Sequence, residues 1–179
     1  MRLALTLILT FCLVGCGPAK SSTAAPMRLS SSAIGADGRI AAPQSAYGQN
    51  RSPPLAWTSV AGAKAYAIIL EDPDAPGARP FVHWTIWNIP GNVTALPEGL
   101  PTAGRLPAPS GAVQGANDAG GTGYYGPRPP SGVHHYRFEI FALGAALTLA
   151  PGATREALAG ALRGHVLATG ELKGTFAAP

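Results

Sequence analysis

Three segments of the chain carry apolar residues in patterns that are typical of β-strands. Residues 64–71 (KAYAIILE) are almost continuously apolar, which predicts a strand that is buried on both faces. Residues 81–89 (FVHWTIWNI) are rich in aromatic and β-branched side chains, which predicts a second central strand. Residues 166–176 alternate between apolar and polar side chains and predict a half-exposed antiparallel strand that closes the fold. These patterns together indicate a mainly β fold.

A fourth strand, predicted for residues 135–143, separates two adjacent histidines. Successive side chains of a strand point to opposite faces. His134 shares its face with three residues that are typical of a core, namely Tyr136, Phe138 and Ile140. The other face carries His135, Arg137 and Glu139. We therefore expect His134 to point into the protein at the entrance of the strand and His135 to point to water.

One segment near the end of the chain has the pattern of an amphipathic helix. In residues 154–163 (TREALAGALR), Thr154 can act as the N-cap and Glu156 suits the first turn. Leu158 and Leu162 are four residues apart and form an apolar stripe. This is the only clearly amphipathic helix that the sequence pattern predicts.

The segment between the central strands and the histidine pair has a different composition. Residues 91–133 contain 10 glycines and 7 prolines in 43 residues. Structureless segments of this length are uncommon in compact domains unless they shape a functional site. We expect loops that wrap around a cavity and that the prolines make rigid.

Length and charge narrow the class of protein. A chain of 179 residues suits one domain with a sizeable core. Charged residues make up only 12% of the chain, and the net charge of +4 comes from scattered cations. Nucleic-acid binding has little support, because phosphate backbones are recognised by concentrated positive charge.

The N-terminus has the pattern of an export signal. Arg2 precedes an apolar stretch that is too short for a comfortable membrane span. The end of this stretch, LVGC, resembles the lipobox of bacterial lipoproteins, in which the chain is cut before the cysteine and the thiol carries the lipid. We therefore predict a signal peptide at 1–15, lipid attachment at Cys16, a flexible tether at 16–25 and a single domain at 26–179. An ordinary secretory signal that is cut near residues 24–25 is the alternative. Both cysteines lie before residue 17, so the mature domain would contain no disulfide.

Polar groups that can do chemistry lie at the ends of the predicted strands. They occur in DPDAP (72–76), HW (83–84) and GPRPPSGVHHY (126–136). Asp72, His83 and His134 form a two-histidine, one-carboxylate set on paper, but the sequence has no short ligand pair such as HxH, and we predict no metal. There is no GxSxG elbow and no recognisable activated nucleophile, so an enzyme is not expected.

These three segments resemble the hallmark motifs of the phosphatidylethanolamine-binding protein family, in its bacterial Raf-kinase-inhibitor-like (YbhB/YbcL-type) branch. The resemblance extends in the same order to NRSPPLAW (50–57), NIPGNVTALPEG (88–99) and NDAGGTGYYGP (117–127). It implies a β-sandwich with a few peripheral helices and a small anion-binding pocket near one end. Carried over residue by residue, the pocket would be lined by Asp72, His83, Gly126, Pro127, His134 and Tyr136.

Two residues depart from the family pattern, and a third has an expected structural role. The arginine that usually follows the pocket histidine is His135 here, and Arg128 stands at a position that is often small or cysteine. By strand alternation His135 faces outward, so the pocket should survive the change. We expect Asp74, the second acid of DPDAP, to stabilise its own turn rather than to contact a ligand.

The resemblance and the residue chemistry predict the same type of function. We expect a non-catalytic binding module that takes a small anion or a phospholipid head group, needs no cofactor and does not bind nucleic acid. It would be exported to the cell envelope and tethered through Cys16 to a bacterial membrane, facing the periplasm or the exterior. The alternative is an inhibitor or regulator of an envelope protease or of another protein partner.

Overall fold

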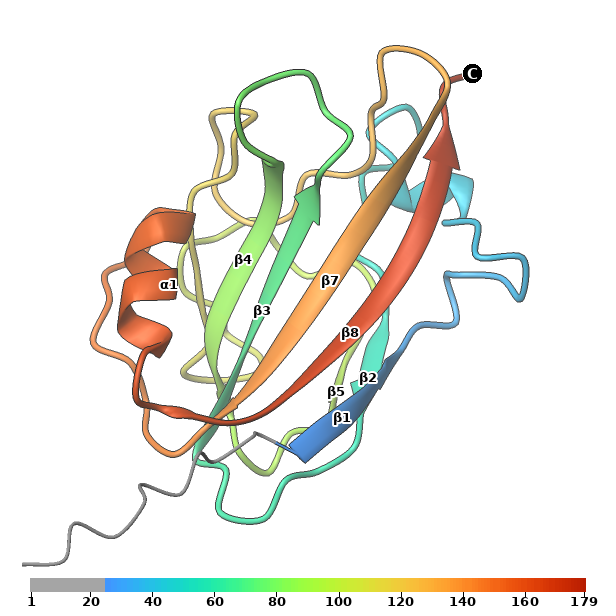
Figure 1. Ribbon diagram of the computed structural model, residues 1–179. Helices are drawn as coiled ribbons and strands as arrows, with labels where there is room; N and C mark the ends of the chain where they lie inside the picture. The colour runs from blue at the N-terminus through green and yellow to red at the C-terminus, as the bar shows by residue number, and fades with distance from the viewer. Residues whose placement is uncertain (1–24) are drawn as a thin grey trace, which may run out of the picture.

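The computed structural model describes residues 25–179 and contains eight strands, one α-helix and one short 3₁₀ helix (Figure 1). The strands are β1 (Ala25–Ser30), β2 (Leu55–Trp57), β3 (Ala65–Asp72), β4 (Phe81–Pro90), β5 (Ala95–Leu96), β6 (Val113–Gln114), β7 (Val133–Leu143) and β8 (Val166–Ala177). The helices are η1 (Ala42–Gln44) and α1 (Arg155–Leu162). The predicted signal peptide, Cys16 and all of the predicted tether except Ala25 lie outside the described residues. No helix within residues 25–179 is long and apolar enough to cross a membrane.

All eight strands belong to one curled sheet in the order β5-β2-β1-β8-β7-β3-β4-β6. Its centre is antiparallel, and β7 pairs with β3 on one side and with β8 on the other. The mainly β fold is confirmed, as are the three strands that the apolar pattern predicts. The sequence pattern missed β1, which pairs in parallel with β8 and so places β8 inside the sheet. The curl then brings β2 and β5 over the inner face, where Leu55, Trp57 and Leu96 belong to one apolar cluster with side chains of β3.

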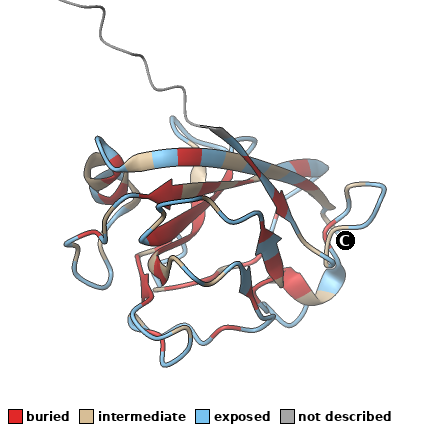
Figure 2. Ribbon diagram, turned by 90° about the horizontal axis from the view of Figure 1, so that it is seen from below, coloured by how far each residue is buried: buried red, intermediate tan, exposed pale blue. Residues whose placement is uncertain are grey.

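Two apolar clusters lie on the two faces of β3, because this strand alternates between them. Tyr66, Ile68 and Leu70 belong to the larger cluster inside the curl, together with Trp84 and Phe138. The opposite face belongs to a smaller cluster beneath α1, whose members include Ala67, Ile69, Leu158 and Leu162. In Figure 2 the buried residues are concentrated in the strands inside the fold, although some loop residues are buried as well. Burial on both faces explains why β3 is almost continuously apolar.

The helix α1 begins and ends as its sequence predicts. The Thr154 side chain caps it by accepting a hydrogen bond from the Ala157 amide at 3.2 Å. Leu158 and Leu162 are its buried residues. The helix thus covers part of the outer face of the sheet with a short apolar stripe.

The strand ends that carry the candidate site residues meet at one end of the sheet. Asp72 closes β3 and pairs with Phe81 at the start of β4, and Glu71 pairs with Arg137 of β7. In Figure 1 the β3–β4 loop and the loop before β7 lie together at the upper end. The start of β1 lies at the opposite end, because Ala25 pairs with Ala168 near the start of β8.

Candidate functional site

The first component of the site is a buried pair of Asp72 and His134. Their strands are neighbours in the sheet, and the Nδ1 atom of His134 lies 2.7 Å from Asp72 Oδ2. The second carboxylate oxygen, Oδ1, accepts a hydrogen bond from the Asp74 amide at 2.9 Å. Because an ionised carboxylate can only accept, Nδ1 of His134 is the donor and Nε2 is the ring nitrogen left for a ligand.

The second component is His83 of β4, whose ring is fixed by the loop between β6 and β7 (residues 115–132), here called the long loop. Its Nδ1 atom donates to the Tyr125 carbonyl oxygen at 2.8 Å, so here too Nε2 remains for a ligand. The ring is buried, and this burial lowers the pKa of His83 below its ordinary value of 6.5, although the carbonyl and the nearby Asp72 carboxylate oppose the shift. The ring stacks on Tyr125 with a centroid distance of 5.8 Å. His83 is therefore held rigidly and favours its neutral form.

These residues open into a cavity of about 240 Å³. It is lined by Asp72, Ala75, Pro76, Phe81, His83, Tyr125, Arg128, Pro130 and His134. The volume suits a group of a few heavy atoms, close to the lower limit for small-molecule sites. Apolar side chains form much of the wall, and the polar groups converge from β3, β4, β7 and the long loop. The cavity can thus enclose a small polar group and orient it by several directed hydrogen bonds.

The structure brings three of the six predicted site residues to the cavity wall, namely Asp72, His83 and His134. Tyr136 lies behind the wall, where its fully buried ring contacts the edge of His83 at a centroid distance of 5.2 Å. Its hydroxyl has no hydrogen-bond partner among residues 25–179, and burial raises its pKa above the ordinary value. A role for Tyr136 in ligand binding stays a prediction.

Gly126 and Pro127 also lie outside the cavity lining, and their surroundings indicate why these residue types occur there. A Cβ atom on Gly126 would collide with the carbonyl oxygen of Gln44. The amide of Gly126 donates to Asn50 Oδ1 at 2.6 Å, and the Pro127 carbonyl accepts from the Ala46 amide at 3.0 Å. Both residues thus fasten the long loop to residues 44–50. Contact with a ligand stays a prediction for them as well.

Sequence reasoning missed several cavity residues that lie in irregular segments. Arg128 was noted only as a departure from the family pattern, yet it lines the cavity and is exposed, which places it at the cavity mouth. It lies 5.7 Å from the centre of the Tyr47 ring, and its Nη1 atom is 3.5 Å from the Tyr125 hydroxyl. Phe81 and Tyr125 were also missed, because loop residues and strand ends have no periodicity that reveals their direction.

A second histidine–aspartate pair lies on the outer side of the same loop. His135 is exposed as expected, and both its amide nitrogen and its Nδ1 atom contact Asp74 Oδ2, at 2.8 and 2.7 Å. These hydrogen bonds lower the pKa of the Asp74 carboxyl group. The expected bond of Asp74 to its own turn is wrong, because Asp72 caps the turn and Asp74 fastens it to β7 instead. Asp74 does not line the cavity, and the absence of a ligand contact stays a prediction.

No group of three or more His, Cys, Asp or Glu side chains within residues 25–179 is arranged to hold a metal ion. The carboxylate of Asp72 is already engaged by His134 and by the turn, and His83 uses its Nδ1 atom on a carbonyl oxygen. The site offers imidazole nitrogens and a guanidinium to a ligand. Its chemistry is that of hydrogen bonding to a small polar or anionic group.

A curled, mainly antiparallel sheet with a small cavity at one end, into which a few polar groups converge, defines a β-sheet binding domain. Comparison with known proteins identifies its family. The family described as phosphatidylethanolamine-binding protein matches residues 30–177, and the chain belongs to this family. The chain is 48% identical over 151 residues to a UPF0098 protein of Methanothermobacter thermautotrophicus, which covers 84% of this chain and 98% of that protein.

Two further relatives bear on the fold and on the N-terminus. The crystal structure of Escherichia coli YbcL, described as a member of the mammalian PEBP family, superposes with a TM-score of 0.78. It is 32% identical, and the match covers 86% of this chain and 99% of YbcL. A relative named as a lipoprotein, LppC of Mycobacterium tuberculosis, is 42% identical over 132 residues, which cover 72% of this chain and 61% of LppC.

Proposed function

We propose that the protein is a non-catalytic binding module that takes a small anion, either free or as a phospholipid head group. The observation that carries this proposal is the cavity of about 240 Å³ in which two buried imidazoles converge and Arg128 stands at the mouth. Membership of the phosphatidylethanolamine-binding protein family supports the same type of function. No side chain at the cavity has the surroundings of an activated nucleophile, which favours binding over catalysis.

The hydrogen bonds of the two rings define how an anion would be held. Since both Nδ1 atoms donate to oxygens, a neutral ring offers Nε2 only as an acceptor. A ring that gains a proton offers Nε2–H as a donor instead. A phosphate group that carries a proton can therefore donate to a neutral ring, whereas a fully deprotonated anion needs a protonated one. Arg128 would supply hydrogen-bond donors whether the two rings are neutral or protonated.

The proposal includes attachment to a membrane of the cell envelope. Cys16 lies in the lipobox-like LVGC segment, outside the described residues, and the relative named as a lipoprotein supports lipidation. Replacing Cys16 by serine should leave the protein without acyl label and release it from membranes. Continued acyl labelling of the Cys16→Ser variant would contradict the assignment.

The binding proposal is tested by titrating the purified Cys16→Ser protein with inorganic phosphate and with phosphoethanolamine. We expect saturable shifts of the His83 and His134 ring resonances at millimolar ligand. A stronger response to phosphoethanolamine would indicate a head group, and an equal response would indicate a free anion. The absence of any shift with both ligands would contradict the proposal.

A matched pair of variants tests the assignment of the two histidines. His134→Ala removes a ring that lines the cavity and should abolish the response to phosphate. His135→Ala removes the adjacent, exposed ring and should leave the response unchanged. The reverse result would place the ligand on the outer face of β7.

A further inference from the structure

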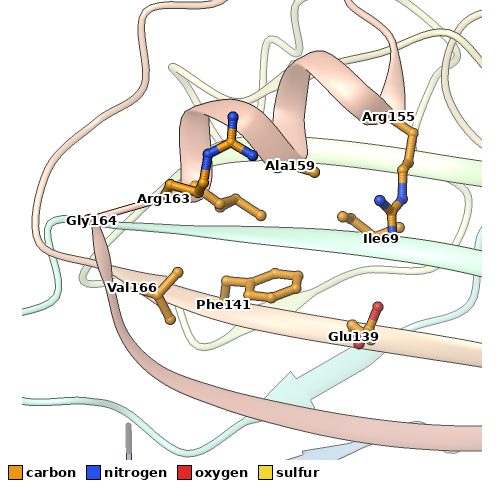
Figure 3. A pocket seen from close by; sticks show the side chains of 9 residues that line it. Ile69, Glu139, Phe141, Arg155, Ala159, Arg163, Gly164 and Val166 are labelled. Carbon is orange, nitrogen blue, oxygen red and sulfur yellow. The ribbon is translucent and has the colours of Figure 1, made fainter. Parts of the chain in front are cut away.

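A second cavity lies beneath the helix on the outer face of the sheet, away from the candidate anion site (Figure 3). Its volume is about 450 Å³, nearly twice that of the first cavity. It is lined by Ile69, Glu139, Phe141, Arg155, Ala159, Leu162, Arg163, Gly164 and Val166. The volume lies within the range of sites that hold small organic ligands.

The floor of this cavity is apolar. Ile69 and Leu162 are buried members of the cluster beneath α1, and Phe141 and Val166 pack against that cluster while remaining partly exposed. In Figure 3 the Phe141 ring lies on the strand side, next to Val166 and facing the helix. The small Ala159 side chain on the helix leaves the space above this ring open. An apolar group of a ligand would therefore remove water from Phe141 and Val166.

The rim of the cavity carries an excess of positive charge. Arg155 and Arg163 lie at opposite ends of the helix, as Figure 3 shows. Arg155 donates from Nε to Glu71 Oε1 at 2.6 Å, so its charge is already matched by a buried carboxylate. Arg163 forms no ion pair or side-chain hydrogen bond with any of residues 25–179.

The carboxylates near the rim limit the charge that a ligand can bring. Glu139 lines the cavity and lies 3.5 Å from Arg137, which also donates to Glu71 at 3.0 Å. A dianion such as a phosphate monoester would meet about twice the repulsion from Glu139 that a monoanion meets, and one negative charge is sufficient to pair with Arg163. Planar carboxylates also match the two parallel N–H donors of a guanidinium group.

We propose that this cavity binds a small amphipathic monocarboxylate. The apolar body of the ligand lies over Phe141 and Val166, and its carboxylate pairs with Arg163. The site is independent of the anion cavity, since the two share no lining residue. The domain would then bind two classes of ligand, a small polar anion in the first cavity and a mostly apolar acid in the second.

The test compares an acid with its neutral counterpart of nearly the same shape. The Cys16→Ser protein is titrated with 3-phenylpropionate and with 3-phenylpropanamide while the Phe141 ring and Val166 methyl resonances are followed. We expect saturable shifts at millimolar concentrations of the acid. The amide should bind roughly fivefold more weakly, because it cannot form the partly exposed ion pair with Arg163. Equal affinity for both ligands would overturn the carboxylate assignment, and no saturable shift with the acid would overturn the site.

Two variants with matched controls locate the ligand. Arg163→Gln should reduce the affinity for the acid to that for the amide, while Arg105→Gln, at an exposed arginine outside the cavity, should change neither. Ala159→Leu should fill the cavity and abolish binding, whereas Ala157→Leu on the exposed side of α1 should not. Unchanged binding in both Arg163→Gln and Ala159→Leu would contradict the proposal.

A last control separates this site from the anion site. His134→Ala should leave binding of 3-phenylpropionate unchanged, and saturating phosphate should not displace the acid. Competition between phosphate and the acid would place both ligands in the first cavity and overturn the second site.

Discussion

The DPDAP turn and the start of β7 form two histidine–aspartate pairs with the same chemistry in opposite environments. Both pairs have an Nδ1 to Oδ2 distance of 2.7 Å. The side chains of His134 and Asp72 are 10% and 4% exposed, whereas those of His135 and Asp74 are 62% and 41% exposed. The difference follows from alternation along β7, which sends adjacent residues to opposite faces. The buried inner pair lines the cavity, whereas the exposed outer pair only connects the β3–β4 loop to β7.

The largest effect is expected when the inner pair is broken. Asp72→Ala leaves the buried His134 ring and the Asp74 amide without their acceptor. Removing one partner of a buried pair costs about 3–5 kcal/mol. We therefore expect the free energy of unfolding, measured with urea, to fall by about 3 kcal/mol or more. A loss below about 1 kcal/mol would mean that the inner pair is no different from a surface pair.

The second prediction uses the neighbouring buried ring. Because burial lowers the pKa of His83 below 6.5, the unfolded chain binds a proton more readily than the folded protein does. The contribution of His83 to the free energy of unfolding should therefore be fully present above pH 6.5. It should decrease as the pH falls toward the folded pKa, by at most about 1.4 kcal/mol per pH unit. The measurement is the urea midpoint as a function of pH.

A matched pair of substitutions isolates this contribution. His83→Asn keeps an N–H donor for the Tyr125 carbonyl but cannot titrate, so part of the decrease in acid should disappear. His165→Asn removes an exposed histidine instead and should leave the His83 contribution in place. An identical pH dependence in the wild type and in His83→Asn would contradict the assignment.

Breaking the outer pair should have a smaller effect. Asp74→Ala removes the acceptor of the His135 amide and ring, but water reaches both groups. Exposed ion pairs contribute about 0.2–1 kcal/mol, so the unfolding free energy should change by less than about 1 kcal/mol. Phosphate affinity should also remain unchanged in the same titration. A cost as large as that of Asp72→Ala would show that holding the loop matters as much as burial.

The smallest effect on stability is expected at the cavity mouth. Arg128→Gln removes an exposed guanidinium whose contacts are the Tyr47 ring and a long hydrogen bond to Tyr125. The urea midpoint should stay the same while phosphate binding weakens a few-fold and depends less on salt concentration. Unchanged phosphate affinity would exclude Arg128 from the ligand's surroundings.

Much of the fold could be predicted because burial leaves a periodic record in the sequence. The two-sided burial of β3, the inward direction of His134 and the cap at Thr154 each follow from spacing alone. The parallel pairing of β1 with β8 could not be predicted, because it joins residues more than 140 positions apart and leaves no local pattern. Six of the nine residues that line the cavity were not among the predicted site residues, for a related reason. Tyr125 and Arg128 lie in a loop, where the backbone path decides which side chains point inward.

The parallel pairing of β1 with β8 also determines at which end of the sheet the preceding chain joins the domain. Ala25 pairs with Ala168, whereas His134 pairs with Phe176, eight positions further along β8. At roughly 3.3 Å per residue, the start of β1 and the cavity are separated by about 26 Å along β8. If Cys16 holds the protein in a membrane as proposed, the tether joins the sheet at the end opposite the cavity, so the length of the sheet adds to the reach of the cavity beyond the lipids of the anchor. This attachment would favour contact of the cavity with solutes or with an opposing membrane over contact with the head groups beside the anchor.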